Sequence, residues 1–150
     1  MSGFSRADLS RARLDVARED LAAASDCIAA GHFRAANNRA YFAIFHAIRA
    51  VLVLDGVDFN EHDRAVGYFY DNYLSSNILD GYLKVVIDFA LDSSNRGDYE
   101  DHYAATREEA ARNIGGAADV LRAVDGHLVS RLEPGATRVD ECPRKLPQSS

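Results

Sequence analysis

Apolar residues recur along most of the chain at the three- and four-residue spacings that are typical of amphipathic helices. This pattern predicts five helices, at about residues 6–30, at 35–54, after Asn60, at about 78–92, and after Thr106. We expect the first two helices to pack against each other through their apolar stripes. The residues predicted to be buried there are Leu14, Leu21, Ile28, Ile44, Phe45, Ile48 and Leu52.

Residues that begin or end helices stand at the borders of these segments. Ser5 with Asp8 three residues later is typical of an N-cap, and Gly31 and Gly56 follow the first two helices. The run from Thr106 to Glu109 has the spacing of a capping box. All three prolines lie beyond residue 133, so none interrupts the helical body. The sequence therefore predicts an all-α protein, an up-and-down bundle of about five helices whose first two run antiparallel.

Length and composition fit one domain with a real core. The chain has 150 residues, of which 47% are hydrophobic, and this content excludes a disordered chain. We place the bundle at residues 5–130 and expect residues 131–150, which are polar and without helical period, to form a disordered tail. Inside the last helix, Gly115 and Gly116 predict the close approach of a neighbouring helix.

Charge and cysteine use restrict the partners and the compartment. The formal net charge is −6, which does not favour broad binding to nucleic acids or membranes. This net charge does not exclude a local basic pocket. No apolar run has the length of a membrane span, and the N-terminus lacks the apolar segment of a signal peptide. Neither Cys27 nor Cys142 belongs to a Cys-x-x-Cys pair. We therefore expect a cytoplasmic protein without disulfides and without a membrane partner.

Several common catalytic motifs are missing. The chain has no phosphate-binding Gly-rich loop, no His-Glu-x-x-His and no Gly-x-Ser-x-Gly. Its five histidines do not cluster at the spacing of metal ligands. We expect neither a metal site nor a cofactor.

The second predicted helix is apolar except for a few polar residues, among them Arg39 and His46. Seven residues are close to two helical turns, so both side chains leave the helix within about 20° of each other and their Cα atoms lie about 10.5 Å apart. Arg offers a fixed cation with a forked donor set that suits phosphate, and His exchanges a proton near neutral pH. This pair is the candidate catalytic site of a metal-independent RNA cleavage.

A structural role is the alternative interpretation of this pair. A core histidine can bond a neighbour, and a buried Arg needs an acidic partner such as Asp98. Spacing alone does not select the pair, because Arg-x4–6-His occurs three times: Arg39 with His46, Arg96 with His102, and Arg122 with His127.

Three stretches resemble the HEPN-domain family. Residues 38–52, N-R-A-Y-F-A-I-F-H-A-I-R-A-V-L, resemble the family's second helix, whose usual pattern is close to S/N-R-A-Y-Y-A-x-F-H-A-A-x-A-L-L. Residues 61–66, E-H-D-R-A-V, resemble its T-H-x-G-V entry to a third helix. Residues 95–99, N-R-G-D-Y, resemble its R-x-x-D-Y turn before the last helix. The resemblance covers about residues 6–130.

The resemblance implies a small up-and-down bundle, commonly dimeric, and two kinds of function. One is a binding or regulatory component of a toxin–antitoxin-like module that contains a minimal nucleotidyltransferase, with RNA or a nucleotide as ligand. The other is an endoribonuclease toxin with an Arg-x4–6-His motif, in which a polar residue often follows the Arg, whereas Ala40 follows Arg39 here. The candidate binding residues taken from the three stretches and their surroundings are Asn38, Tyr41, His62, Arg96, Asp98, Tyr99 and His102.

Two structural expectations follow. Arg39 and His46 should face a polar groove within reach of Asp98 or Tyr99, and Tyr99 should plug the end of the bundle. Six aromatic residues exceed what one small bundle easily buries, which predicts a homodimer or a contact with the nucleotidyltransferase. They are Tyr41, Phe42, Phe45, Phe69, Tyr70 and Tyr73.

Overall fold

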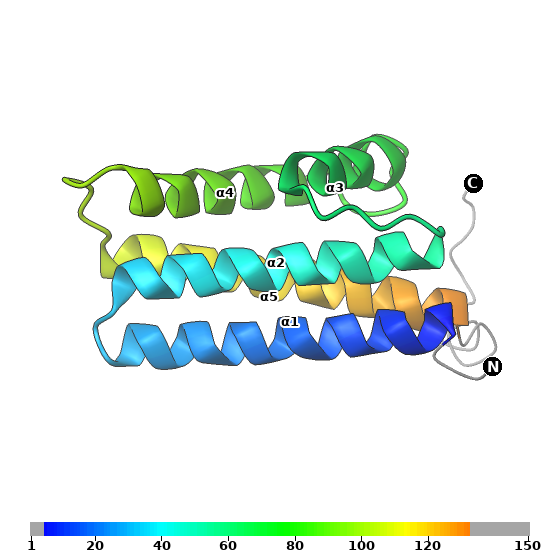
Figure 1. The fold of residues 1–150 in the computed structure, drawn as a ribbon, viewed down its shortest axis with the longest axis horizontal. Coiled ribbons are helices and arrows are strands. Elements are labelled where there is room, and N and C mark those ends of the chain that lie inside the picture. The colour runs from blue at the N-terminus through cyan, green and yellow to red at the C-terminus, as the bar shows by residue number, and fades with distance from the viewer. Residues whose placement is uncertain (1–4, 133–150) are drawn as a thin grey trace.

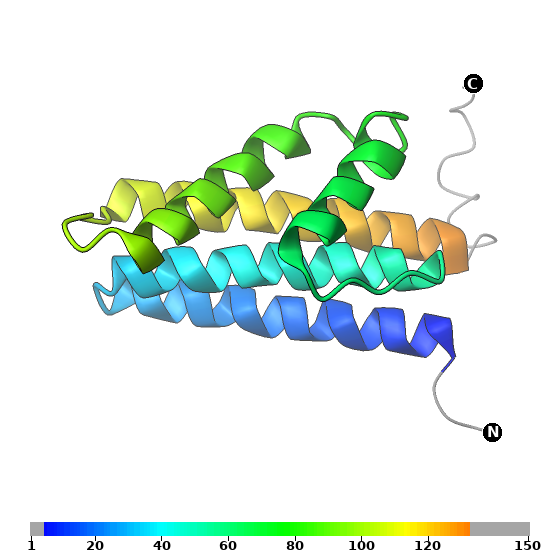
Figure 2. The ribbon, with the colours of Figure 1, turned by 45° about the horizontal axis from the view of Figure 1, so that its top comes forward.

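The computed structural model describes residues 5–132, which form five α-helices and no strand. In chain order the elements are α1 (Arg6–Ala29), α2 (Phe33–Leu54), α3 (His62–Phe69) with its π-helical continuation η1 (Tyr70–Leu74), α4 (Leu83–Tyr99) and α5 (Arg107–Leu132). Figure 1 shows α1 alongside α2, with α5 behind α2, and Figure 2 shows α3 and α4 crossing above α2 and α5. The predicted all-α bundle is confirmed.

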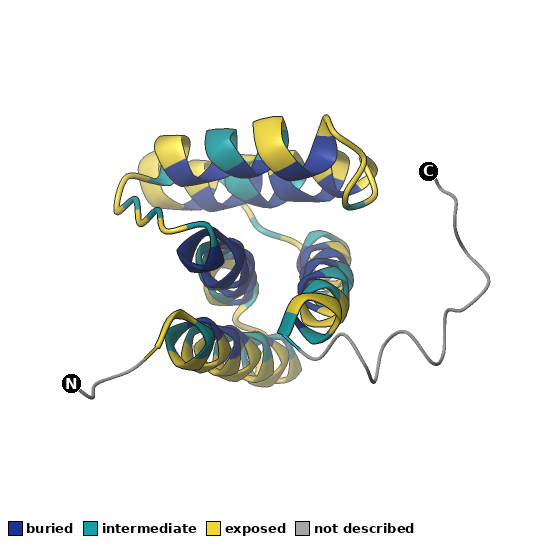
Figure 3. Cartoon of the chain, turned by 90° about the vertical axis from the view of Figure 1, so that its right-hand side faces the viewer, coloured by how far each residue is buried: buried dark blue, intermediate teal, exposed yellow. Residues whose placement is uncertain are grey.

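Helix α2 is the centre of the molecule. It packs against α1, α3, α4 and α5, and Figure 3 shows it buried almost all round. Alanines on this helix allow neighbours to approach closely, since Ala43, Ala47 and Ala50 are fully buried. Burial on nearly every face explains why this stretch of sequence is so much more apolar than the other helices.

The predicted contact between α1 and α2 is largely confirmed. Five of the seven residues are buried, and Leu21 and Ile28 are only partly buried. Ser10 adds a polar anchor inside it, where its hydroxyl donates to the carbonyl of Ala50 at 2.6 Å. A buried hydroxyl that finds such a partner avoids the cost of desolvation without a hydrogen bond.

The predicted caps of α1 and α5 and the glycines predicted to end α1 and α2 are confirmed. Ser5 and Asp8 form a reciprocal capping box on α1, with the Asp8 amide 3.1 Å from the Ser5 hydroxyl. The Glu109 amide donates to the Thr106 hydroxyl at 3.1 Å before α5. Gly31 and Gly56 take positive φ values of 83° and 82°, which glycine adopts without steric cost.

The predicted position of the fourth helix was wrong. The helix α4 begins at Leu83 because Asp80 and Gly81 form a turn, in which the Asp80 carboxylate accepts from the Tyr82 amide at 2.9 Å. It continues past residue 92 because its serines bond neighbouring helices. Ser93 donates to Glu109 at 2.8 Å, and Ser94 donates to Asn38 at 2.9 Å.

Two expectations for the end of α4 were also wrong. Residues 95–99 belong to the last turns of α4 and do not form the turn before α5. Tyr99 does not plug the bundle, because its side chain is 82% exposed. Gly97 faces Arg34 of α2, and a residue two positions later points about 200° away around the helix, toward solvent. Arg34 closes this end instead, since its guanidinium donates to the carbonyls of Gly97 and Tyr103.

The reasoning that led from aromatic residues to a dimer was wrong in its premise. Tyr41, Phe45, Phe69 and Tyr73 are all buried within the single chain. Arg131 and Leu132 are still helical, so α5 passes the predicted border at residue 130. The rest of the predicted tail, residues 133–150, lies outside the described residues.

Candidate functional site

One face of α2 is only partly covered. It carries Arg39, Phe42, His46 and Arg49, which we call the α2 stripe. These positions are three or four residues apart, so they share one side of the helix. The stripe is flanked by residues of α1 and by the segment that leads into α3, and these neighbours decide the chemistry of the face.

A carboxylate of α1 brings the candidate catalytic pair together. Asp20 accepts from Arg39 Nη1 at 3.1 Å through Oδ1 and contacts His46 Nδ1 at 2.8 Å through Oδ2. The Asp20 side chain is 13% exposed, against 40% for Arg39 and 27% for His46. The expected contact with Asp98 or Tyr99 was wrong, because both lie exposed near the C-terminal end of α4. Antiparallel packing of α1 along α2 supplies the acid instead.

The contact with Asp20 fixes the tautomer of His46. An ionised carboxylate only accepts hydrogen bonds, so the neutral ring carries its proton on Nδ1 and keeps a lone pair on Nε2. Within residues 5–132, Nε2 of His46 has no hydrogen-bond partner, and it is not among the buried atoms that lack one. The basic nitrogen of His46 is therefore open to solvent, beside an Arg39 that has donors left over.

A second carboxylate organises the far end of the α2 stripe. Asp58 accepts from Arg49 at 2.5 Å and from Arg13 of α1 at 3.0 Å. These hydrogen bonds, from Arg13 first and then Arg49, hold the pKa of Asp58 below its ordinary value. The Arg13 and Arg49 side chains are 16% and 18% exposed, so they form a fixed basic end to the stripe.

The first residue of α3 closes the same face. His62 stacks on Phe45 with ring centres 4.0 Å apart, and its Nδ1 lies 2.9 Å from the hydroxyl of Tyr41. Burial raises the pKa of Tyr41 to about 12, and the charge of Asp63 adds to this. Burial also lowers the pKa of His62 below its ordinary value, against the influence of Asp63. The candidate residues Tyr41 and His62 thus lie beside Arg39 and His46.

The other candidate binding residues lie elsewhere. Asn38 accepts from Ser94 and holds α4 against α2. Arg96 lies at the C-terminal end of α4, with Asp92 and Glu100 each at 3.8 Å, and its guanidinium covers the ring of Tyr103. That open end is also where Asp98, Tyr99 and His102 are found. The structure therefore does not bring Arg96, Asp98, Tyr99 or His102 to the α2 stripe.

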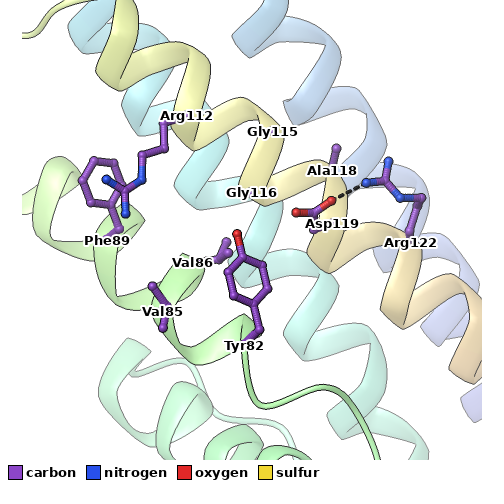
Figure 4. A pocket seen from close by; sticks show the side chains of 10 residues that line it. All are labelled: Tyr82, Val85, Val86, Phe89, Arg112, Gly115, Gly116, Ala118, Asp119 and Arg122. Carbon is purple, nitrogen blue, oxygen red and sulfur yellow. Dashed lines mark hydrogen bonds and ion pairs between the residues drawn. The ribbon is translucent and has the colours of Figure 1, made fainter.

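A separate groove of about 500 Å³ runs between α4 and α5 (Figure 4). Tyr82, Val85 and Phe89 line it from α4 and the residue before it, and Arg112 covers Phe89 with its guanidinium 3.8 Å from the ring centre. Arg122 also lines this groove, whereas His127 packs on Tyr73. The third Arg–His spacing therefore does not form a joint site.

Sequence reasoning missed Asp20, Asp58 and Arg13. A signal for Asp20 was present, because this acid stands among the apolar positions Ala17, Leu21 and Ala24 of the first helix. An acid in that place needs a partner on the facing helix. In residues 5–132 no group of three His, Cys, Asp or Glu side chains is arranged to hold a metal ion, and no helix there has the length and apolarity to cross a membrane.

The fold and the face just described define an all-α bundle with an Arg–Asp–His cluster on its central helix. The family model of the HEPN domain matches residues 10–127, and the chain belongs to the HEPN-domain family. A stretch of 67 residues is 28% identical to the UPF0332 protein PH1297 of Pyrococcus horikoshii. This match covers 45% of the chain and 47% of that curated relative, so the chain spans about half of the relative's length. The predicted family is confirmed.

Proposed function

We propose that the Arg39–Asp20–His46 cluster is the active site of a metal-independent endoribonuclease. The observation that carries this proposal is the single Asp20 carboxylate, which contacts both catalytic candidates and leaves Nε2 of His46 open to solvent. A base oriented by a carboxylate is a recurring device of nucleophilic catalysis. Arg39 is 40% exposed, so burial does not by itself require the ion pair.

The chemistry is an attack by the ribose on the neighbouring phosphate. His46 Nε2 takes the proton of the 2′-hydroxyl, the O2′–P bond forms, and the P–O5′ bond breaks. The departing 5′ oxygen takes a proton from water and leaves as a hydroxyl, and the other product ends in a 2′,3′-cyclic phosphate. Arg39 stabilises the added negative charge on the phosphate oxygens with its free N–H groups.

The rest of the α2 stripe supports a nucleic-acid ligand. Three guanidinium groups lie along it, from Arg39, Arg49 and Arg13, in a chain whose overall charge is −6. Phe42 lies among them, with the Arg39 guanidinium 5.0 Å from its ring centre. Basic groups next to an aromatic ring suit single-stranded RNA, whose phosphates and bases are both accessible.

Cleavage of a single-stranded RNA in EDTA tests this proposal. His46→Ala should lower the rate by about 10²–10⁴-fold and Arg39→Ala by about 10²–10³-fold, while both variants stay folded. The all-deoxy oligonucleotide should resist cleavage because it lacks the attacking hydroxyl. Arg96→Ala and His102→Ala are matched controls, since they carry the same kind of spacing at the end of α4 and should keep full activity.

Two results would contradict the proposal. One is a wild-type protein that never cleaves RNA. The other is a loss of activity in the Arg96 or His102 variants that equals the loss in the Arg39 or His46 variants, which would move the site to the end of α4. A drop of several degrees in Tm for His46→Ala without any effect on RNA would instead support a structural pair.

We also propose a second candidate, a binding or regulatory component of a toxin–antitoxin-like module with a minimal nucleotidyltransferase as partner. The exposed Tyr82 and Val85, at 57% and 55%, give this candidate its specific support, because a protein contact would cover them. Ala40, where related ribonucleases often carry a polar residue, also favours it. Light scattering at micromolar concentration tests self-association, and a clean 16.5 kDa monomer would favour a heteromeric partner over the predicted homodimer.

A further inference from the structure

We infer that His62 is a second catalytic residue of the proposed ribonuclease, a neutral imidazole whose Nε2–H donates a hydrogen bond to the scissile phosphate. This inference rests on the proposed function of the α2 stripe. The inference assigns to His62 a role that differs from that of His46. Nδ1 of His62 faces a hydroxyl that can donate, whereas Nδ1 of His46 faces a carboxylate that accepts, so the two rings are held in opposite tautomers.

The hydrogen bond between Tyr41 and His62 has a defined direction. The side chain of Tyr41 is only 2% exposed, and the part of the chain that the structure describes offers its hydroxyl no partner other than His62 Nδ1, at 2.9 Å. A buried O–H needs an acceptor, so Tyr41 donates and Nδ1 accepts. The proton of the neutral ring then lies on Nε2. At His46 the carboxylate of Asp20 accepts, and the proton lies on Nδ1.

The imidazole rings of His46 and His62 lie against the same two phenyl rings. Between ring centres, His46 is 6.2 Å from Phe42 and 6.1 Å from Phe45. His62 is 5.9 Å from Phe42 and 4.0 Å from Phe45. The two distances to Phe45 limit the separation of the imidazole centres to about 10 Å. This limit allows one phosphate to accept a hydrogen bond of about 2.8 Å from His62 while the neighbouring 2′-hydroxyl lies within reach of His46.

His62 donates its hydrogen bond in the neutral form. Burial disfavours its charged form, and the nearby His46 and Arg49 act in the same direction, whereas Asp63 acts against them. Within residues 5–132 no hydrogen bond to Nε2 is found, and this atom is not among the buried ones without a partner. A neutral imidazole that polarises an oxygen while another group moves the proton is an established division of roles in enzymes. No proton leaves His62 in this step.

Nitrogen-15 NMR of the histidine rings tests the inference without any need for activity. At a pH at which both rings are neutral, His62 should show the Nε2–H tautomer and His46 the Nδ1–H tautomer. The probe is a 2′-O-methyl RNA, which binds but lacks the attacking hydroxyl, and it should shift the Nε2 signal of His62. A His62 ring in the Nδ1–H tautomer, or one that the RNA leaves unchanged, would overturn the inference.

Cleavage assays on three variants complete the test. His62→Ala should lower kcat by about 10²–10³-fold, as expected for the loss of one donor to the developing charge, with a small change in KM. His62→Gln, which keeps an N–H donor, should restore part of that loss. Tyr41→Phe should mix the tautomers of His62 and lower kcat several-fold. Equal loss in the Ala and Gln variants would contradict donation by His62.

The two proposals fail in different ways. A wild-type protein that does not cleave RNA, but shows both tautomers as assigned and a shift of His62 with the 2′-O-methyl RNA, would refute the ribonuclease proposal and leave His62 as a phosphate-binding donor. Cleavage that depends on His46 and Arg39 but not on His62 would refute only the present inference.

Discussion

At the scale of single residues, Asp20 is the centre of the candidate site. Its two oxygens serve different partners, Arg39 at 3.1 Å and His46 at 2.8 Å. A carboxylate shared in this way orders both groups without burying either of them completely. The ion pair with Arg39 adds little stability, because exposed pairs contribute about 0–1 kcal/mol and the Arg39 side chain is 40% exposed. We therefore propose that Asp20 orients His46 and Arg39 more than it stabilises the fold.

Asp20→Asn separates these two roles. The amide keeps the size of the side chain but loses the charge and one acceptor, so His46 loses its fixed tautomer. We expect RNA cleavage to fall by about tenfold or more, since oriented acid–base groups contribute about 10²–10⁴-fold, with only a small change in Tm. Asp58→Asn is the matched control, because Asp58 also bridges two arginines but does not contact His46. A large loss of Tm with unchanged cleavage in Asp20→Asn would assign Asp20 to the fold alone.

At the scale of helices, α4 and α5 meet at one glycine. A Cβ atom added to Gly116 would lie 2.5 Å from Cγ1 of Val86, whereas one added to Gly115 would meet no atom of the described part of the chain within 4 Å. The expected close approach is thus confirmed at Gly116, and Gly115 faces the open groove between the helices (Figure 4). Val86 is β-branched and buried, so it has little freedom to move away.

The two glycines should respond to alanine in opposite directions. Gly115→Ala should raise the free energy of unfolding by about 1 kcal/mol, the difference in helix propensity. Gly116→Ala gains the same propensity but overpacks the contact, which costs about 1–3 kcal/mol, so a net loss is expected. Urea unfolding measures both values, and in a Val86→Ala background the loss at Gly116 should disappear. Equal effects at the two positions would show that α4 does not approach α5 closely at Gly116.

The helices differ in how far the sequence alone could place them. Both ends of α1, the C-terminal end of α2 and the start of α5 were predictable. Local signals mark them, namely the Ser5 cap, Gly31, Gly56 and the Thr106 cap, and these coincide with the limits of the apolar pattern. The ends of α4 were not predictable, because Ser93 and Ser94 keep the helix going through contacts with other helices. Local propensity contains no information about such contacts.

The candidate site shows the same division. The shared face of Arg39 and His46 follows from a spacing of seven residues on one helix and was predictable. The choice of Asp20 as their partner was not, because it depends on how α1 is rotated against α2. The acidic partner named from the sequence was Asp98 instead, whereas the three-dimensional arrangement leaves Asp98 in solvent near the end of α4.

At the scale of the whole molecule, central burial of α2 links the site to the fold. The same helix supplies the core of the bundle and the α2 stripe, so changes in global stability and changes at the site have to be measured separately. A network around Asp55, the residue that caps the C-terminal end of α2, contributes to stability. Asp55 accepts from Tyr73 at 2.6 Å and pairs with Arg131 at 2.8 Å, and His127 packs on Tyr73 with ring centres 5.3 Å apart.

This network makes the stability of the fold depend on pH. Burial, followed by the charge of Arg131, lowers the pKa of His127 below its ordinary value, against the influence of Asp55. Among residues 5–132, the buried Nε2 of His127 has no hydrogen-bond partner. The folded state therefore binds fewer protons than the unfolded state, in which a histidine has a pKa of about 6.5. Stability should be complete above that pH and should fall as the pH drops from about 6.5 toward the lowered pKa of the folded state.

Thermal unfolding of the wild type and of the His127→Leu variant, measured between pH 8 and pH 5, tests this effect. His127→Leu removes both the titrating group and the unpaired nitrogen, so its Tm should decline less between pH 7 and pH 5 than that of the wild type. Part of the decline in Tm should remain in that variant, because the pKa of His62 is also lowered by burial. His102→Gln changes an exposed imidazole and should keep the wild-type curve. If His127→Leu loses Tm as steeply as the wild type over this range, burial of neutral His127 is not a source of the acid sensitivity.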